Sequence, residues 1–342
     1  MTTPHDHLPQ NLPQADPAQP VTVVTGAAGF ISSCVVAALN AAGQSNLVLV
    51  DDFDRPAKAR NFDGREALTC IDRRVFMAWE AQQAEGAIAA LIHLGARTDT
   101  AEQDWAIFED LNIGYSQAMW QIAVRRNIPL VYASSAATYG GGELGFADRH
   151  DLVADFRPLN PYGRSKNDFD AWALAQEAAP PFWAGLKFFN VYGPNEYHKG
   201  RMASVMLHAF RQIRETGKLK LFRSHRADFK DGEQLRDFVY VKDVVKVIEF
   251  LLAARPESGI YNLGTGQART FLDLGRSVFA ALELEPKIEF IDTPADIRDA
   301  YQYFTQAEMA KLLDAGYTDG FHSLEDGIHD YVRNFLVSGR VF

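Results

Sequence analysis

Val21-Thr-Val-Val-Thr-Gly26-Ala-Ala-Gly29-Phe-Ile-Ser32 is a β-branched run, a turn with two glycines and the start of an apolar, alanine-rich stretch that continues to Leu39. This order predicts a strand, a glycine turn and a helix. Gly26 and Gly29 allow a pyrophosphate to approach the backbone, and the helix that follows offers N–H groups and a positive dipole end to the anion. The stretch therefore predicts a dinucleotide site.

Further apolar runs at 46–50, 67–71, 88–93 and 129–133 read as strands, with helical patterns between the later ones, notably 104–126. Strands that alternate with helices predict an α/β fold, a doubly wound parallel sheet of the Rossmann type with its ligand at the carboxyl ends of the strands. After residue 190 this order loosens, and charged stretches such as 223–235 alternate with helical ones such as 243–254. We therefore expect a smaller mixed α/β substrate lobe as well.

The order of elements predicts three parts of the chain. Residues 1–20 read as a disordered tail. The dinucleotide-binding domain is expected at 21–190 together with about 237–265. The substrate domain is expected at about 191–236 together with 266–342.

Composition excludes several classes of protein. The net charge of −10 argues against a nucleic-acid partner, because phosphate-driven binding needs a basic face. No apolar run approaches the roughly 18 residues of a membrane span, and the first twenty residues lack the apolar segment of a secretory signal, so we expect a cytoplasmic protein. The two cysteines, Cys34 and Cys70, lie in apolar segments and are expected to be buried and unpaired. No metal site is predicted.

An acidic pair follows the second predicted strand. Asp51 lies 22 residues after Gly29, where a carboxylate would bind the adenine ribose. Asp51 and Asp52 would repel a 2′-phosphate, yet Arg55, Lys58 and Arg60 follow closely and could neutralise one. The residues themselves leave NAD and NADP open.

Tyr162 and Lys166, in Asn160-Pro-Tyr-Gly-Arg-Ser-Lys166, lie one helical turn apart on one face of a predicted helix. A tyrosine with a pKa of about 10 works as a base near neutral pH only if its phenolate is stabilised by roughly 4 to 5 kcal/mol. A positive charge about 4 Å away supplies on the order of 4 kcal/mol at an effective dielectric constant near 20. We therefore expect Lys166 to lower the pKa of Tyr162 beside a nicotinamide.

Together with the glycine turn, Leu94-Gly95-Ala96 and the run Tyr132-Ala-Ser-Ser-Ala-Ala-Thr-Tyr-Gly140 resemble the extended short-chain dehydrogenase/reductases, that is, the NAD-dependent epimerase/dehydratase family. The resemblance implies that Ser135 binds a substrate hydroxyl, that Tyr162 exchanges its proton and that Lys166 binds the nicotinamide ribose. Ser134 is the neighbouring candidate for a structural hydrogen bond.

Later motifs at 188–204, 236–243, 261–266 and 301–305 narrow the resemblance, over residues 21–338, to the family members that epimerise C6 of ADP-bound heptoses. It implies transient hydride transfer to a tightly bound NADP, with Tyr162 and Lys199 as opposed acid/base groups. It also implies a role in lipopolysaccharide biosynthesis and a homo-oligomer, possibly a homopentamer. The residues themselves leave Lys199 open as a surface cation or a phosphate ligand, and His208 as a satisfied helix histidine.

The same resemblance assigns cofactor contacts to Gly26, Gly29, Phe30, Ile31, Asp51, Asp52, Lys58, Leu94, Gly95, Ala96, Asn112, Lys166 and Val191. It assigns contacts with the ADP-heptose to Asn190, Lys199, Arg201, His208, Phe222, Arg223, Ser224, His225, Arg236 and Tyr301.

The chain departs from the family pattern at a few positions. Ser32 stands where the glycine turn usually has its third glycine, and Asp52 stands where a neutral residue is common. Arg201 replaces a small residue, and the charged stretch 226–234 is an insertion. A 4,6-dehydratase is disfavoured, because Ala136-Ala137-Thr138 lacks the acidic pair that eliminates water. An epimerase acting on C4 of UDP- or GDP-sugars, or another nucleotide-sugar oxidoreductase, stays the alternative function.

Overall fold

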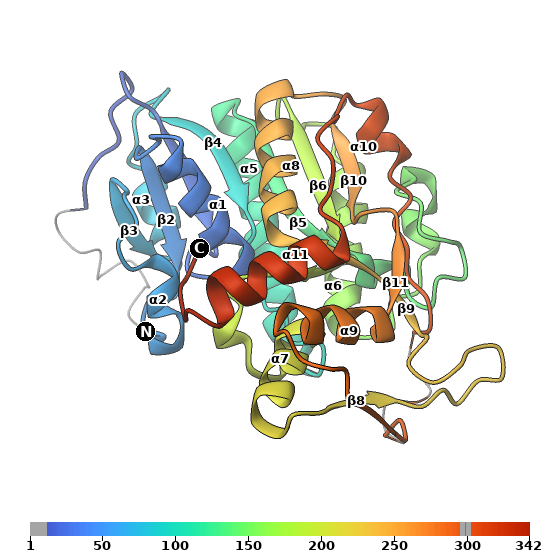
Figure 1. The fold of residues 1–342 in the computed structure, drawn as a ribbon. Helices are drawn as coiled ribbons and strands as arrows, with labels where there is room; N and C mark the ends of the chain where they lie inside the picture. Colours follow the sequence, from blue (N-terminus) through green and yellow to red (C-terminus); the bar gives the residue numbers. More distant parts are fainter. Residues whose placement is uncertain (1–11, 295–297, 299–301) are drawn as a thin grey trace.

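A seven-stranded parallel sheet forms the centre of the computed structural model, which describes residues 12–294, 298 and 302–342 (Figure 1). The order of its strands is β10-β6-β5-β4-β1-β2-β3, which reverses between β1 and β4. The strands are β1 (Val21–Thr25), β2 (Leu47–Asp51), β3 (Thr69–Asp72), β4 (Ile88–His93), β5 (Leu130–Ser135), β6 (Trp183–Phe188) and β10 (Gly259–Leu263). This topology confirms the predicted doubly wound α/β fold.

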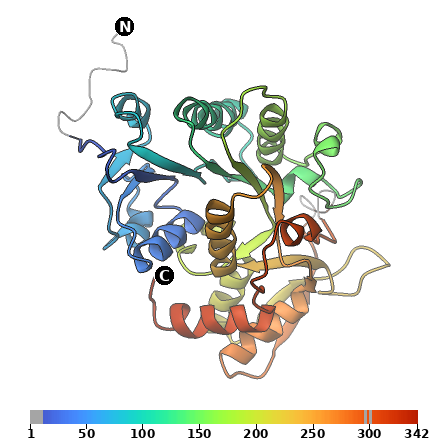
Figure 2. The same ribbon diagram turned by 90° about the horizontal axis from the view of Figure 1, so that it is seen from above.

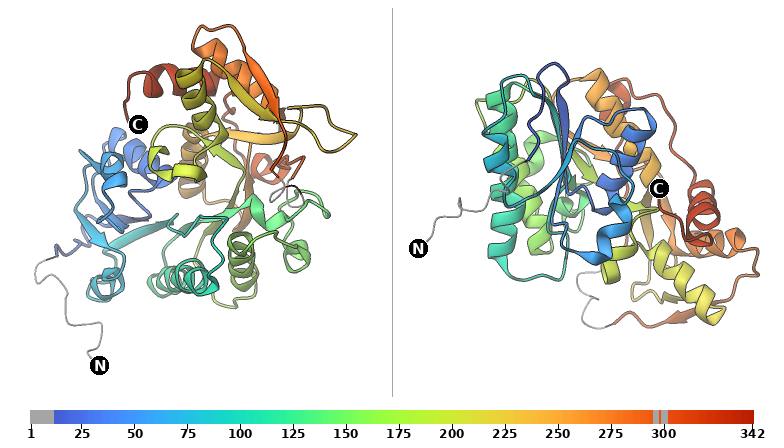
Figure 3. Two further views of the ribbon diagram at one scale, coloured as in Figure 1. Left: turned by 90° about the horizontal axis from the view of Figure 1, so that it is seen from below. Right: turned by 90° about the vertical axis from the view of Figure 1, so that its left-hand side faces the viewer.

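Helices cover both faces of the sheet, and Figures 2 and 3 show the two layers. On one face α1 (Phe30–Ala41) packs against α8 (Val241–Ala254). The other face carries α3 (Phe76–Glu80), α5 (Tyr115–Arg126) and α6 (Pro161–Leu174). Because both faces are covered, strands such as β2 are buried at every residue, which explains their unbroken apolar runs in the sequence.

The predicted helix at 104–126 is interrupted. It consists of α4 (Trp105–Phe108), the π-helical segment η2 (Glu109–Gly114) and α5. Short segments elsewhere in the large lobe are η1 (Pro56–Lys58), α2 (Ala59–Phe62), η3 (Ala136–Tyr139) and η4 (His150–Asp155).

The small lobe lies beyond the carboxyl ends of the main strands and contains two short sheets. One pairs β9 (Leu235–Tyr240) with β7 (Asn190–Tyr192) and β11 (Ala268–Thr270), and the other pairs β8 (Leu219–Phe222) with β12 (Ile288–Ile291). The remaining elements of this half of the chain are η5 (Tyr197–Met202), α7 (Val205–Thr216), α9 (Phe271–Ala281), α10 (Ala310–Asp314), α11 (Leu324–Asp330) and the π-helical η6 (Tyr331–Leu336). This mixed lobe agrees with the prediction for the later sequence.

Two expectations about the ends and edges of the molecule need correction. Residues 12–20 were expected to belong to a disordered tail, but the carbonyl of Pro13 accepts a hydrogen bond from Trp79, and Ala15 is buried. The rest of the predicted tail, residues 1–11, lies outside the described residues. Both cysteines were expected to be buried, yet only Cys34 is; Cys70 is exposed because β3 is an edge strand. Neither thiol is paired.

In the described part of the chain, no helix combines the length and the apolar character that crossing a bilayer requires.

Candidate active site

A cleft of about 630 Å³ opens at the carboxyl ends of the central strands, where the strand order reverses. This is the position at which doubly wound sheets bind their ligands. Of the residues that the sequence singled out, the cleft is lined by Gly26, Gly29, Phe30, Ile31, Asp51, Asp52, Lys58, Leu94, Gly95, Ala96, Ser135, Tyr162, Lys166, Asn190, Val191 and Lys199.

The glycine turn forms one end of this cleft. Gly26 has a φ of +67°, and a Cβ there would lie 2.7 Å from the Cα of Gly95, so only glycine fits. A Cβ on Gly29 would lie 2.8 Å from the carbonyl oxygen of Gly26. Helix α1 begins at Phe30, and no side chain caps it. The turn and the uncapped helix therefore fit the pyrophosphate of a dinucleotide.

Ser32, which replaces the third glycine, is accommodated at the contact between α1 and β1. It is buried, and its hydroxyl donates a hydrogen bond to the carbonyl of Thr25 at 3.3 Å. The extra Cβ is thus compatible with the glycine turn.

Asp51 is buried at the end of β2, and both of its carboxylate oxygens are engaged. One oxygen accepts from the backbone N–H of Ala28 at 2.8 Å, and the other accepts from Lys58 Nζ at 2.8 Å. Asp52 forms an ion pair with Arg55 at 2.7 Å, and this hydrogen bond lowers the pKa of Asp52. The two negative charges that would repel a phosphate are therefore each paired with a cation.

Ser135, Tyr162 and Lys166 form what we call the tyrosine side of the cleft. Against the effect of burial, the hydroxyl of Ser135 lowers the pKa of Tyr162, and both side chains line the cleft. Helix α6 presents Tyr162 and Lys166 one turn apart. The start of this helix is defined by Asn160, whose side chain caps it by accepting from the N–H of Gly163 at 2.8 Å, and by a proline at its first position.

Burial is the main influence on the pKa values of Lys166 and Tyr162 in the protein alone. The Nζ of Lys166 donates to the carbonyl of Ala133 at 2.8 Å, and burial lowers the pKa of Lys166 to about 8. Burial also raises the pKa of Tyr162 above its usual value, although the hydrogen bond with Ser135 opposes this shift. In the protein alone, burial thus dominates the pKa of Tyr162, and the lowering by Lys166 beside a nicotinamide stays a prediction.

A buried charge network lies beneath the tyrosine side. Asp170 and Lys187, both with 0% of the side chain exposed, form an ion pair at 2.8 Å. Asp170 also accepts from the hydroxyl of Ser134 at 2.6 Å and from that of Tyr132 at 3.0 Å. Ser134 is therefore bound to the core, whereas Ser135 adjoins Tyr162.

Glu196, His198 and Lys199 form the lysine side of the cleft. Lys199 lies in η5, and its Nζ is 5.7 Å from the ring centre of Phe30 in α1. Helices α1 and α6 cover opposite faces of the sheet (Figure 2); the lysine side adjoins Phe30 of α1, and the tyrosine side is carried by α6. Burial lowers the pKa of Lys199, and the charge of Glu196 opposes this shift.

Contacts from distant parts of the chain support the loop of the lysine side. Tyr197 donates its hydroxyl to the carbonyl of Arg340 at 2.8 Å, and the N–H of Phe342 donates to the side chain of Asn195 at 2.8 Å. On the inner side, the amide of Asn61 donates to the carbonyl of Asn195 at 2.9 Å and lies 3.2 Å from the Nδ1 of His198. The last residues of the chain thus lie against this loop.

His93 lies below the cleft in a row of hydrogen bonds. Ser116 donates to the carbonyl of Asn112 at 2.6 Å, so it accepts from the Nε2 of His93 at 2.9 Å. The Nδ1 of His93 then accepts from Thr25 at 2.7 Å. Burial lowers the pKa of His93 to about 3, which keeps the ring neutral.

Asn112, a predicted cofactor contact, does not line the cleft but lies beneath it. Its side chain accepts from the N–H of Arg97 at 2.8 Å and donates to the carbonyl of Arg97 at 3.0 Å. It also donates to Ser165 in α6 at 2.9 Å. Asn112 therefore joins the loop after β4 to the helix that carries Tyr162.

Arg201 and His208 also lie outside the cleft lining. Arg201 is exposed and pairs with both carboxylate oxygens of Asp99, at 2.8 and 3.0 Å, and Asp99 itself lines the cleft. His208 is exposed on α7, and its Nε2 is 3.4 Å from the carbonyl of Arg201.

The other predicted substrate contacts gather in the small lobe around Tyr303. The hydroxyl of Tyr303 accepts from the N–H of His225 at 2.8 Å, and Arg223 pairs with Asp292 at 3.1 Å. Arg236 is buried, and its Nη1 donates to the carbonyl of Leu235 at 2.8 Å. Phe222 and Ser224 lie beside them at the end of β8, whereas Tyr301 lies outside the described residues.

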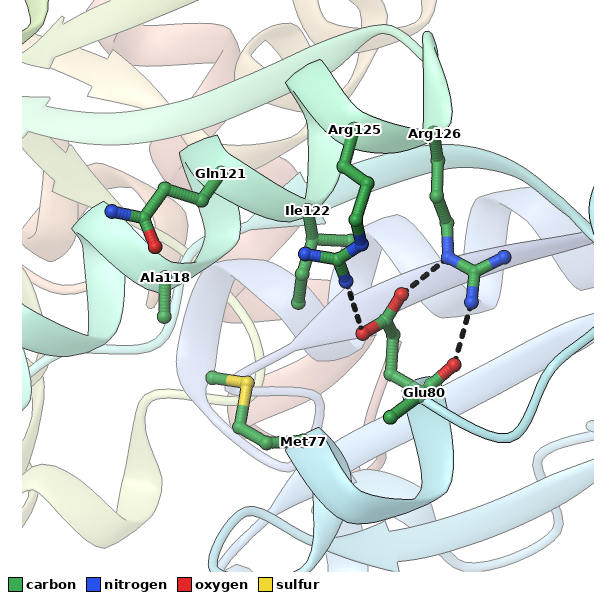
Figure 4. Close-up of a pocket in the computed structure, with 8 residues that line it drawn as sticks. Met77, Glu80, Ala118, Gln121, Ile122, Arg125 and Arg126 are labelled. Carbon is green, nitrogen blue, oxygen red and sulfur yellow. Dashed lines mark hydrogen bonds and ion pairs between the residues drawn. The ribbon is translucent and has the colours of Figure 1, made fainter.

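A second hollow of about 400 Å³ lies between α3 and α5 (Figure 4). Its charged centre is Glu80, which pairs with Arg125 at 2.6 Å and with Arg126. Arg126 donates in addition to the backbone carbonyl of Glu80 at 2.6 Å. These two ion pairs fasten α3 to α5, so we regard this hollow as structural.

Several cleft residues were missed in the sequence: Arg73, Arg97, Asp99, Tyr115, Glu196 and His198. Glu196 and His198 belong to the same motif as Lys199, and that proximity was the available signal. Arg73 directly follows β3, so its place at a carboxyl end of the sheet was also predictable.

The comparisons with known proteins agree with this geometry. Residues 22–264 match the model of the NAD dependent epimerase/dehydratase family. The chain is 46% identical over 323 residues to the ADP-L-glycero-D-manno-heptose-6-epimerase of Fusobacterium nucleatum, which covers 92% of this chain and 97% of that protein.

Two solved structures share the fold. The ADP-L-glycero-D-manno-heptose-6-epimerase of Helicobacter pylori superposes with a TM-score of 0.77 at 27% identity, covering 93% of this chain and 97% of the other. A UDP-N-acetylglucosamine 4-epimerase from Methanobrevibacter ruminantium also gives a TM-score of 0.77, at 22% identity, covering 94% and 99% of the two chains. The shape of the backbone thus does not distinguish a 6-epimerase from a 4-epimerase.

Proposed function

The chain belongs to the NAD dependent epimerase/dehydratase family, and from this we propose that it converts ADP-D-glycero-D-manno-heptose to ADP-L-glycero-D-manno-heptose by inverting C6. Its sequence identity to a relative named for this activity supports the substrate. The observation that carries the mechanism is that one cleft is lined by Ser135, Tyr162 and Lys166 and also by Lys199.

Inversion of a carbinol through a carbonyl requires an acid/base group in each of two orientations: one accepts the proton of the hydroxyl as the hydride leaves, and the other donates a proton to the carbonyl oxygen as the hydride returns. We assign the first role to the phenolic oxygen of Tyr162, whose pKa the hydroxyl of Ser135 lowers against the effect of burial. We assign the second to the Nζ of Lys199. Ser135 is then in reach of a substrate hydroxyl bound beside Tyr162, and Ser134 has a structural role.

We propose that the glycine turn and the first turn of α1 bind the pyrophosphate of the cofactor and that Lys166 binds the nicotinamide ribose. When bound there, a nicotinamide would supply a reversible acceptor for the C6 hydride.

We propose NADP as the cofactor. Asp51 has both oxygens engaged, so its carboxylate is less available to the ribose hydroxyls that NAD would offer. Arg55, Lys58 and Arg73 line the same part of the cleft and bring positive charge for a 2′-phosphate. Denaturing the purified enzyme and identifying the released dinucleotide tests this: NADP is expected, and NAD alone would refute it.

For the sugar nucleotide, we propose that Asn190 and Lys199 contact the heptose. The small-lobe group of Phe222, Arg223, Ser224, His225 and Arg236 is the proposed site for the ADP portion, with Arg201 and His208 at its edge. A homo-oligomer, with the homopentamer as the expected form, and the cytoplasmic location stay predictions; analytical ultracentrifugation tests the oligomeric state.

The decisive experiment is incubation with ADP-D-glycero-D-manno-heptose, followed by NMR of the product at C6. We expect inversion at C6 and, in D2O, no solvent deuterium at C6, because the hydride is returned rather than exchanged. An unchanged C6 configuration refutes the function. UDP-galactose serves as the control substrate, and its conversion to UDP-glucose in place of the heptose reaction would establish the 4-epimerase alternative.

A further inference from the structure

Glu196 is a buried carboxylate in the lysine side of the cleft, three residues before Lys199. It is 0% exposed, yet it lines the cleft, and the reaction described above does not use it. A fully buried carboxylate is costly unless its oxygens are bound, so the partners of Glu196 indicate what it does.

The carboxylate of Glu196 joins the two ends of the segment 193–204. One oxygen accepts from the hydroxyl of Ser204 at 2.7 Å and from the N–H of Gly193 at 3.4 Å. The other oxygen accepts from the N–H of Ser204 at 2.5 Å. Because both oxygens accept from backbone N–H donors, this arrangement suits the ionised carboxylate.

The strength of this closure matters because Lys199 lies within the segment. Gly200, the next residue, has a φ of +54°. The backbone N–H of Lys199 donates to the carbonyl of Glu196 at 3.0 Å, which places the two residues on one turn. The side chain of Ser204 also caps α7 by accepting from the N–H of Leu207 at 3.2 Å. The segment that Glu196 closes therefore ends at the start of a regular helix.

Other titratable groups face this pair. Cys34 of α1 and Tyr331 of η6 face Glu196, and burial raises the pKa of both, so both are neutral near pH 7. Tyr197 also faces Glu196, and burial raises its pKa to about 12. On the cationic side are Lys58 and His198, and burial lowers the pKa of His198 to about 4.

Glu196 and Lys199 influence each other directly. Burial lowers the pKa of Lys199, and the charge of Glu196 opposes this shift. Burial raises the pKa of Glu196, and the hydrogen bonds from Ser204 and Gly193 and the charge of Lys199 oppose that shift. An ammonium in a buried cleft loses its proton readily without such a partner.

We propose that Glu196 is a positioning residue for Lys199: its carboxylate closes the loop that carries the amine and places an acidic group on the same turn as Lys199. The inference rests on the proposed function, in which Lys199 exchanges a proton with the C6 hydroxyl. It adds a residue that acts through Lys199 and does not touch the substrate.

The test uses Glu196→Gln, which removes the charge at nearly constant shape. The lysines of the full-length enzyme are dimethylated with ¹³C-formaldehyde, and the resonance of Lys199 is titrated by NMR, with Lys199→Arg for its assignment. We expect the pKa of Lys199 to fall in Glu196→Gln. The kcat at pH 7 should fall about tenfold, and the limb of the pH profile that reports Lys199 should move to lower pH.

Glu80→Gln is the matched control, because Glu80 is likewise a buried glutamate but pairs with arginines between α3 and α5, outside the cleft. It is expected to lower the melting temperature and to leave the pKa of Lys199 unchanged. An unchanged pKa of Lys199 in Glu196→Gln, or an equal fall in both variants, overturns the inference.

The titration reports on Lys199 even if the heptose is not converted, so failure of the inference and failure of the proposed function are distinguishable. If Glu196→Gln does not fold, the reciprocal measurement replaces it, since coupling between two sites is mutual. Lys199→Met should then raise the pKa of the Glu196 carboxyl in ¹³C-glutamate-labelled enzyme, and no change would overturn the inference.

Discussion

The tyrosine side and the lysine side of the cleft present one proposed acid/base group each, but they are built differently. Tyr162 is carried by a regular helix that is fastened to the sheet by the buried pair of Asp170 and Lys187. Lys199 is carried by a short, irregular segment closed by Glu196 and supported by the last residues of the chain.

The difference shows where the stability of each side originates. The tyrosine side depends on the core of the large lobe, so disturbing its support is expected to destabilise the whole protein. The lysine side depends on a few polar contacts between distant segments, so disturbing them is expected to open one loop while the fold persists. The following predictions test this contrast, from the largest effect to the smallest.

Tyr162→Phe removes the proposed proton acceptor and is expected to lower kcat about 10⁴-fold, because a positioned acid/base group contributes up to about that factor. The rate of C6 inversion in single turnover measures it. Tyr115→Phe is the control: Tyr115 also lines the cleft and donates to the carbonyl of Arg73 at 3.4 Å. A loss of less than tenfold in Tyr162→Phe would remove the tyrosine side from the chemistry.

Asp170→Asn leaves Lys187 as an uncompensated buried charge and is expected to lower the free energy of unfolding by about 3–5 kcal/mol. Urea denaturation measures it. Asp168→Asn, two residues away on the same helix, removes only a half-exposed pair with Arg164 and should cost less than about 1 kcal/mol. Equal effects would contradict the view that the tyrosine side depends on the core.

Lys199→Met is expected to lower kcat about 10²-fold, while the free energy of unfolding stays nearly unchanged, because Lys199 supports chemistry and not the core. Lys220→Met, on the exposed face of β8, is the control and should retain full activity. Full activity in Lys199→Met would refute the mechanism with two opposed groups.

Tyr197→Phe removes one hydrogen bond between the loop and Arg340 and is expected to ease local opening of residues 197–202 by about 1 kcal/mol. Hydrogen exchange followed by mass spectrometry measures it, with the peptide that covers α6 as the internal reference. Faster exchange in both peptides would show that the two sides are not independent.

The same contrast explains what the sequence revealed. The glycine turn and the pair Tyr162 and Lys166 were predictable because the chemistry depends on neighbours within one turn or one helix. The main sheet was predictable because strands that are buried on both faces consist of unbroken runs of apolar residues. The interruption of the helix at 104–126 was not, because its apolar spacing is also that of a regular helix.

The lysine side was predictable only as a resemblance, because its partners are far apart in the chain. The contact of Tyr197 with Arg340 spans 143 residues, and that of Asn61 with Asn195 spans 134. The effect of burial on the pKa of Tyr162 could not be predicted for a similar reason. The desolvation that raises this pKa comes from residues that only the fold brings together, whereas the sequence spacing identifies only one nearby charge, that of Lys166.

The π-helical segment η2 changes the direction in which side chains point along one helical stretch, so residues within it and residues after it contact different parts of the protein. Successive residues of an α-helix are rotated by about 100°, so the wider turn at Glu109–Gly114 shifts everything after it. Within this segment, Asn112 is aimed at the loop after β4; after it, Met119 and Trp120 are buried. Deleting one residue here would restore a regular helix and turn one of these two faces to the wrong side, so this stretch tolerates substitution far better than any change of length.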